Sequence, residues 1–159
     1  MYQGGSINKE MQAAMEELFY KYGVDIFFTG HTHSYERDYP VYNGVTESTG
    51  ALAYVNPRAT THLMIGGAGN DEMSESTEDP PIPSLDEMLS YIHPEGNGKW
   101  RPSKDAGTWT ALTDVNHVGI GIVQIIDDST LQFDYVRTAD GSVFDQITLT
   151  RDHSIFITN

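Results

Sequence analysis

The residues best suited to chemistry are the two histidines of the sequence Gly30-His31-Thr32-His33. Imidazole is the commonest side-chain ligand of transition metals, and two imidazoles separated by one residue on a turn can face one cavity. The motif directly follows an apolar run at residues 24–28, which predicts a short buried strand. Ligands gather at the carboxyl ends of strands in open α/β sheets. This placement makes a metal site as well supported as the alternative of two loop histidines without a role.

Two histidines do not complete a metal site, since structural zinc takes four protein ligands and catalytic zinc usually takes three. The chain has no cysteine, so thiolate ligands, a cysteine nucleophile and disulfides are excluded. Nearby carboxylates could complete a site for a single metal ion, with Glu36 or Asp38 as candidates. The other histidines are expected to be packed, turn or surface residues: His62, His93, His117 and His153.

A glycine-rich loop, Gly66-Gly67-Ala68-Gly69-Asn70, follows a second short apolar strand predicted at residues 62–65. Successive backbone N–H groups in such a loop can bind phosphate. This loop lacks both the Gly-x-Gly-x-x-Gly spacing and the lysine of a P-loop. We therefore interpret it as a tight turn.

The elements that must position these residues follow from hydrophobic periodicity. A helix is predicted over residues 6–22, with Ser6 or Asn8 as its N-cap and Gly23 at its end. Residues 34–60 are expected to form a loop. Alternating apolar residues predict three antiparallel strands in residues 118–126, 131–135 and 143–150. The apolar stripe expected to be buried on the helix consists of Met11, Ala14, Met15, Leu18, Phe19 and Tyr22.

Composition limits the class of protein. The chain has 159 residues, which favours a single domain, and 38% of them are hydrophobic, as in a globular protein. It carries 9 Lys and Arg against 23 Asp and Glu, for a formal net charge of −14. Nucleic acids and anionic membranes need a cationic surface, so we expect neither as a partner. Residues 71–98 contain acids and four prolines but no Lys or Arg, and are expected to form an exposed excursion.

The longer sequence at residues 25–37, Asp-Ile-Phe-Phe-Thr-Gly-His-Thr-His-Ser-Tyr-Glu-Arg, goes beyond a bare His-x-His. It resembles the Gly-His-x-His-x-Tyr-Glu-Arg signature of purple acid phosphatases, in the calcineurin-like metallophosphoesterase superfamily. Residues 62–70 and 117–150 are similar to further segments of that family. The resemblance implies an α/β fold: the C-terminal part of a four-layer α/β/β/α sandwich, with a mixed sheet and closing antiparallel strands.

The resemblance also implies an activity and its cofactors. Family members hydrolyse phosphate monoesters by a metal-bound hydroxide at a dinuclear centre of one ferric ion and one divalent ion, which is zinc, manganese or iron. By position, His31 would bind the divalent ion and His33 the ferric ion. Family members are commonly secreted, vacuolar or lysosomal. Four further residues would orient the ligands or brace the loop, namely Tyr35, Glu36, Arg37 and Asn70, and the alternative for Glu36 and Arg37 is a surface ion pair.

Other family motifs are missing from the sequence. It contains no Gly-Asp-x-x-Tyr, no Gly-Asn-His and no Val-x-x-His, which are among the motifs that supply the other ligands in the family. We therefore expect residues 1–159 to be an incomplete C-terminal region of such an enzyme, or a truncated gene product, and inactive alone. Its partner would be the missing N-terminal half or a second copy in a homodimer. The alternative is a truncated, non-catalytic relative that acts as a folding or interaction module.

Overall fold

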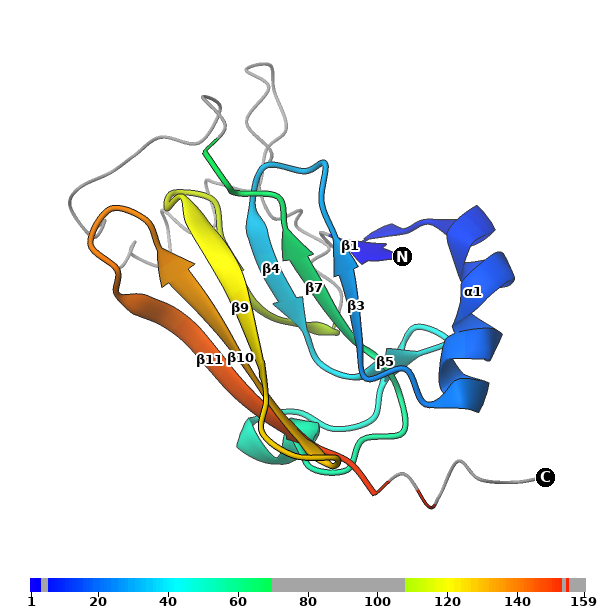
Figure 1. The fold of residues 1–159 in the computed structure, drawn as a ribbon. Coiled ribbons are helices and arrows are strands. Elements are labelled where there is room, and N and C mark those ends of the chain that lie inside the picture. The colour runs from blue at the N-terminus through cyan, green and yellow to red at the C-terminus, as the bar shows by residue number, and fades with distance from the viewer. Residues whose placement is uncertain (4–5, 70–107, 153, 155–159) are drawn as a thin grey trace.

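The structure is a computed structural model that describes residues 1–3, 6–69, 108–152 and 154. A four-stranded and a three-stranded β-sheet pack face to face, and one long helix lies against the four-stranded sheet, which is called the first sheet below (Figure 1). Within the described residues the fold is thus one helical layer on two sheet layers. The acidic segment predicted at residues 71–98 lies outside the described residues.

The N-terminal elements are a short hairpin and a helix. Strands β1 (Tyr2–Gln3) and β2 (Ser6–Ile7) pair with each other, and helix α1 (Lys9–Tyr22) follows. Asn8 is the N-cap, since its side chain accepts a hydrogen bond from the N–H of Met11 at 2.8 Å. Gly23 ends the helix in the left-handed conformation, at φ 65°. The helix begins later than predicted because Ser6 is part of β2.

The face of α1 that is buried differs from the prediction. Of the six apolar residues expected on the buried stripe, only Phe19 is buried. Glu16 is buried instead, because the hydroxyl of Tyr2 and the N–H of Asn43 both donate hydrogen bonds to its carboxylate. The prediction that this stripe is buried was therefore wrong, since polar contacts with neighbouring segments orient the helix and leave most of the stripe exposed.

The first sheet carries the candidate histidines. It contains β3 (Ile26–Thr29), β4 (Tyr35–Asp38), β7 (Thr61–Ile65) and β8 (Thr110–Asp114), in the order β3-β7-β4-β8. β3 and β7 are parallel, whereas β4 is antiparallel to both β7 and β8. The two strands predicted at residues 24–28 and 62–65 are confirmed as β3 and β7, and the mixed sheet is as expected.

The prediction of a loop at residues 34–60 was wrong. This segment contains the internal strand β4, the small hairpin of β5 (Val41–Tyr42) and β6 (Val45–Thr46), and the 3-10 helix η1 (Ala51–Tyr54). β4 consists of Tyr, Glu, Arg and Asp, so it shows no apolar pattern that would indicate a strand in the middle of a sheet. The tertiary structure provides polar partners for Tyr35, Glu36 and Arg37, on both faces of the sheet.

The second sheet is the predicted antiparallel meander. It contains β9 (Gly119–Ile125), β10 (Thr130–Arg137) and β11 (Val143–Thr150), in the order β11-β10-β9. The core between the two sheets is apolar and aromatic, with Tyr35 stacked on Tyr135 at a ring distance of 4.0 Å. Among the helices in the described part of the chain, none is long and apolar enough to cross a membrane.

Candidate functional site

The two histidines lie on the loop that follows β3, at the carboxyl end of that strand. His31 is exposed and His33 is half-buried. His31 adopts a left-handed backbone, with φ 76°. Such a conformation costs a non-glycine residue about 1–3 kcal/mol, and residues of this kind cluster at functional sites. An open pocket of about 720 Å³ lies beside this loop and is lined by His31, Gly30 and Phe28.

Gly66, at the end of β7, supports this loop from the neighbouring strand. A Cβ atom at position 66 would lie 1.9 Å from the carbonyl oxygen of Thr32, between the two histidines. The same oxygen accepts a hydrogen bond from the N–H of Ser34 at 2.9 Å. Sequence reasoning treated Gly66 only as part of a turn. The signal in the sequence is a glycine that directly follows a strand, and the structure pairs that strand with β3.

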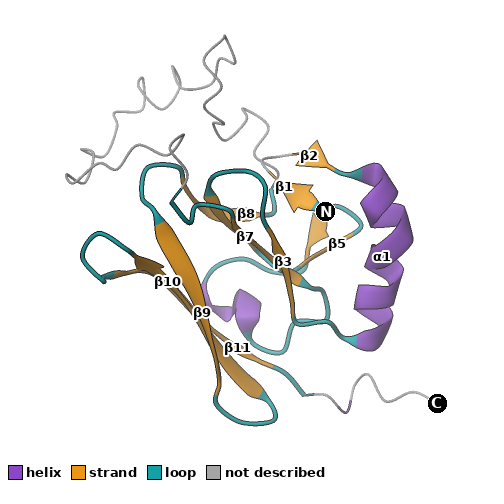
Figure 2. Cartoon of the chain, turned by 45° about the horizontal axis from the view of Figure 1, so that its top comes forward, coloured by secondary structure: helices purple, strands orange, loops and turns teal. Residues whose placement is uncertain are grey.

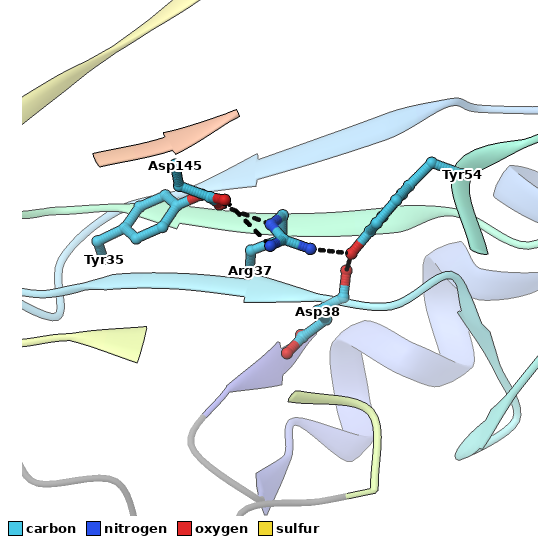
Figure 3. Close-up of polar contacts among 5 residues, drawn as sticks. All are labelled: Tyr35, Arg37, Asp38, Tyr54 and Asp145. Atoms are coloured by element: carbon cyan, nitrogen blue, oxygen red, sulfur yellow. Dashed lines mark hydrogen bonds and ion pairs between the residues drawn. The ribbon is translucent and has the colours of Figure 1, made fainter. Parts of the chain in front are cut away.

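Tyr35 and Arg37 extend from β4 toward Asp145 of the second sheet (Figure 3). Arg37 donates from Nε to Oδ2 of Asp145 at 2.6 Å and from Nη2 to Oδ1 at 3.0 Å. The hydroxyl of Tyr35 donates to Oδ2 at 2.5 Å. Arg37 also donates to the hydroxyl of Tyr54. This network joins β4 to β11.

The ion pair of Arg37 is therefore enclosed rather than exposed. The Arg37 and Asp145 side chains are only 12% and 7% exposed. Sequence reasoning missed Asp145, although an acidic residue on the inward face of an alternating strand could have indicated it. Arg37 lies on β4, which begins two residues after His33.

Glu36 and Asp38 lie on the opposite face of β4 and are both buried. Thr110 on β8 donates to Glu36 at 3.1 Å. Oδ1 of Asp38 has no hydrogen-bond partner in the described part of the structure. Burial raises the pKa of Asp38, and the neighbouring carboxyl of Glu36 raises it further. Burial also lowers the pKa of His62, on the same side of the sheet, to about 3.

The raised pKa of Asp38 predicts a particular pH dependence of stability. An aspartate in an unfolded chain titrates near 3.9. Between that value and the higher pKa in the folded chain, the folded state binds more protons than the unfolded state. The contribution of Asp38 to stability is therefore complete at low pH and is lost as pH rises through the folded pKa. We expect the melting temperature of the wild type, minus that of Asp38→Asn, to fall as pH rises from about 4 to 7.

Thermal melts of both proteins in half-unit pH steps would check this prediction. His62 has the opposite effect, because its lowered pKa destabilises the fold as pH falls below about 6.5, but both proteins share it. Asp140→Asn is the control. A hydrogen bond from Ser142 lowers the pKa of Asp140, so its difference curve should be flat above about pH 4. Parallel melting curves for the wild type and Asp38→Asn would contradict the prediction.

The described residues do not bring the other candidate ligands together. No group of three or more His, Asp, Glu or Cys residues that could hold a metal ion occurs among them, so neither Glu36 nor Asp38 completes a site there. His62 packs against Tyr2, and Nδ1 of His117 lies 2.8 Å from Oδ2 of Asp114, which is consistent with their expected packing and turn roles. Asn70, His93 and His153 lie outside the described residues.

Comparison with known proteins places this arrangement in a family. A family model described as "Iron/zinc purple acid phosphatase-like protein C" matches residues 59–146. The human protein named acid phosphatase type 7 is 48% identical over 86% of this chain and 26% of its own length. The zebrafish (Danio rerio) protein of the same name is 34% identical over 94% of this chain and 28% of its own length.

A solved structure supports the same assignment. The purple acid phosphatase from yellow lupin (Lupinus luteus) seeds aligns with a TM-score of 0.61 and 26% sequence identity, over 91% of this chain and 21% of that chain. The chain therefore spans about a quarter of the length of the curated relatives it matches. Two Arabidopsis relatives are named probable inactive purple acid phosphatases. Because the family model matches more than half of its residues, the chain belongs to the purple acid phosphatase family.

Proposed function

We propose that this chain contributes His31 and His33 to the dinuclear metal centre of an acid phosphatase that hydrolyses phosphate monoesters. The observation that carries the proposal is the position of the His-x-His loop, at the carboxyl end of β3 and beside an open pocket, in a member of this family. Residues 1–159 would be the C-terminal region of a four-layer sandwich, with residues 71–98 as an excursion. Such an enzyme would be secreted, vacuolar or lysosomal.

The two imidazoles fit a metal centre as part of its ligand set. His31 would bind the divalent ion, which is zinc, manganese or iron, and His33 the ferric ion. Further ligands are required, because even a single catalytic metal ion usually takes three protein ligands. When bound, such a pair of ions lowers the pKa of water and offsets the negative charge of the phosphoryl oxygens. That local positive charge would attract phosphate despite a formal net charge of −14.

The residues around the histidines would then act by positioning them. Gly66 lets the end of β7 support the loop at Thr32. Arg37 and Asp145 hold β4, the strand that leaves the loop, against the second sheet. A rigid support of this kind matters because small displacements of catalytic groups lower rates strongly.

The second candidate is a non-catalytic relative that acts as a folding or interaction module. The observation that favours it is that the described residues contain no cluster of three possible metal ligands. The two candidates differ in metal binding, since a module that has lost the metal centre would not need its histidines.

The test compares the wild type with the His31→Ala/His33→Ala double variant, in metal binding and in hydrolysis of a chromogenic phosphate monoester near pH 5. We expect affinity for Zn²⁺ or Mn²⁺ to fall by at least about tenfold in the variant, since loss of even an outer partner of a ligand costs that much. His117→Gln, which can still bond to Asp114, is the control and should bind metal as the wild type does. Equal binding by the double variant would overturn the proposal.

Hydrolysis gives a second readout. We expect no turnover from the isolated chain above that of the double variant, because the described residues hold too few ligands. Turnover that disappears in the double variant would mean that the 159 residues assemble a complete metal centre. In that case the expectation that the chain needs further ligands would be wrong.

A further inference from the structure

Asp114, the last residue of β8, is a buried carboxylate that the proposed function does not use. Its side chain is 4% exposed. Oδ1 accepts hydrogen bonds from the N–H groups of Asn116 at 2.8 Å and His117 at 3.3 Å, and Oδ2 lies 2.8 Å from Nδ1 of His117. Aspartate side chains form turns in this way with the backbone two residues further on. Asp114 thus closes the turn at residues 115–118, which is called the β8–β9 turn below.

The β8–β9 turn lies at the same end of the first sheet as the histidine loop (residues 30–34). β3 and β7 are parallel, and β4 is antiparallel to both β7 and β8, so β3, β7 and β8 all end there. From that end the turn leads into β9 of the second sheet (Figure 2). Tyr35, the first residue of β4, is paired with Ile65 and with Asp114. Asp114 is therefore paired with the residue that comes two positions after His33.

A first series of contacts joins the turn to the histidine loop through the residues that follow β7. The N–H of Gly119, which directly follows the turn, donates to the carbonyl oxygen of Gly67 at 3.1 Å. The preceding residue, Gly66, lies so close to the histidine loop that a Cβ there would be 1.9 Å from the carbonyl oxygen of Thr32. Thr32 lies between the two histidines. The β8–β9 turn thus supports the histidine loop through backbone contacts.

A second series of contacts runs through two stacked tyrosines. The hydroxyl of Tyr135 on β10 donates to the carbonyl oxygen of His117 in the turn at 3.4 Å. A Cβ at position 119 would lie 2.6 Å from the Tyr135 ring, so the chain leaves the turn in close contact with that ring. The Tyr135 ring stacks on the Tyr35 ring at 4.0 Å, and Tyr35 begins the strand that leaves the histidine loop. The two series of contacts therefore reach the chain on both sides of His33.

We propose that Asp114 is a positioning residue for His31 and His33. Its carboxylate fixes the β8–β9 turn, and the turn holds Thr32 and Tyr35, which lie on either side of His33 in the chain. The inference rests on the proposed function, and it adds a residue of another strand that acts on the candidate metal ligands through the backbone. A carboxylate suits this role because it accepts several hydrogen bonds at once, and those bonds are stronger than bonds between neutral groups.

The test separates support of the histidine loop from general stability. Asp114→Ala removes all contacts of the carboxylate, whereas Asp114→Asn retains an oxygen that can accept from the N–H groups of the turn. Amide hydrogen exchange is measured by NMR on the full chain with EDTA present. The N–H of Ser34 donates to the carbonyl oxygen of Thr32 at 2.9 Å, so its exchange reports opening of the histidine loop. Phe133, on the central strand of the second sheet, reports global unfolding.

In Asp114→Ala we expect the exchange of Ser34 to become at least about tenfold faster relative to that of Phe133, because the turn loses hydrogen bonds to a charged group. In a separate titration without EDTA we expect Zn²⁺ affinity to fall by about tenfold, the lower end of the cost of losing an outer support of a metal ligand. Asp114→Asn should restore both quantities to near the wild-type values. Asp114→Ser, a weaker acceptor in such turns, replaces Asp114→Ala if that variant does not fold.

Asp127→Ala is the matched control. Oδ1 of Asp127 accepts from the N–H of Ser129 at 2.9 Å, so Asp127 closes a turn of the same kind at the other end of β9. Because that turn has no printed role in holding Thr32 or Tyr35, the substitution should change neither the relative exchange of Ser34 nor the affinity for Zn²⁺.

Three results would overturn the proposal. Equal acceleration at Ser34 and Phe133 would mean that Asp114 stabilises the whole fold and not the histidine loop in particular. Equal behaviour of Asp114→Ala and Asp114→Asn would mean that the hydrogen bonds of the turn play no part. Faster exchange of Ser34 with unchanged Zn²⁺ affinity would mean that Asp114 supports the loop without positioning its histidines.

Failure of the proposed function would give a different result. A wild type that binds no Zn²⁺ would contradict the proposed function, whatever Asp114 does. The exchange measurement needs no metal, so it would then decide by itself whether Asp114 holds the histidine loop in place.

Discussion

Arg37→Met is expected to lower the free energy of unfolding by about 3–5 kcal/mol, the usual cost of removing one partner from a buried ion pair. The Asp145 side chain is only 7% exposed, and the substitution removes the cation that pairs with its carboxylate between the two packed sheets. It also removes the hydrogen bond that Arg37 donates to Tyr54. In a chain of this length the loss corresponds to a fall in melting temperature of roughly 10 °C. Urea denaturation followed by tryptophan fluorescence would measure it.

A double-mutant cycle gives this prediction its control. Arg37→Met/Asp145→Leu removes both charges, and replacing a buried ion pair by apolar side chains is often neutral. We therefore expect the double variant to be more stable than Arg37→Met alone. Arg58→Met is the matched arginine control: Arg58 is exposed over the ring of Tyr20, where such a contact contributes about 0.5–1 kcal/mol. If Arg37→Met costs no more than Arg58→Met, the pair does not join the sheets as described.

Gly66→Ala is expected to displace the histidine loop. The added Cβ would lie 1.9 Å from the carbonyl oxygen of Thr32 and 2.9 Å from its carbonyl carbon. Both atoms belong to the backbone, so no side chain can rotate away, and either β7 or the loop must move. Overpacking of this kind costs about 1–3 kcal/mol and occasionally more. Because a shift of about 1 Å can lower a rate by about a hundredfold, we expect a large loss of metal affinity as well.

Gly30→Ala is the matched control for this prediction, because it adds the same methyl group to the same loop. A Cβ at position 30 has no atom within 4 Å, so we expect metal affinity and melting temperature close to those of the wild type. Titration with Zn²⁺ and thermal melts of the two variants, side by side, would check both expectations. Similar behaviour of Gly66→Ala and Gly30→Ala would mean that the contact at Thr32 does not position His31 and His33.

Local patterns were enough to predict several elements. The alternation of apolar residues predicted the three strands of the second sheet, and the structure has them as β9, β10 and β11. Gly23 could be identified as the end of a helix, and Asn8 as one of two possible N-caps, because capping depends on residues within one turn. The apolar run before Gly30 placed His31 and His33 after a strand, as the structure shows. The family resemblance is confirmed by the comparisons.

Other features depended on contacts between distant residues. β4 was mistaken for a loop because its charged residues indicate a surface segment, whereas Arg37 is paired with Asp145, 108 residues away. The prediction of which face of α1 is buried was wrong, because an amphipathic pattern shows that a helix has an apolar face but does not show which neighbour covers it. Glu16 faces inward because Tyr2 and Asn43 donate hydrogen bonds to it. Each of these partners lies far along the chain from Arg37 or Glu16, so the residues next to Arg37 and Glu16 give no indication of it.

The sequence alone was thus enough to predict the strand that precedes His31 and His33 and to indicate the family to which their motif points. Contacts between distant segments were needed to show that Gly66 supports the loop at Thr32, that Tyr35 and Arg37 join the two sheets, and that Glu36 and Asp38 face the other way. Periodicity and capping arise from neighbours within a few residues, whereas strand order, burial of charge and close backbone approach arise only when the folded chain brings distant segments together.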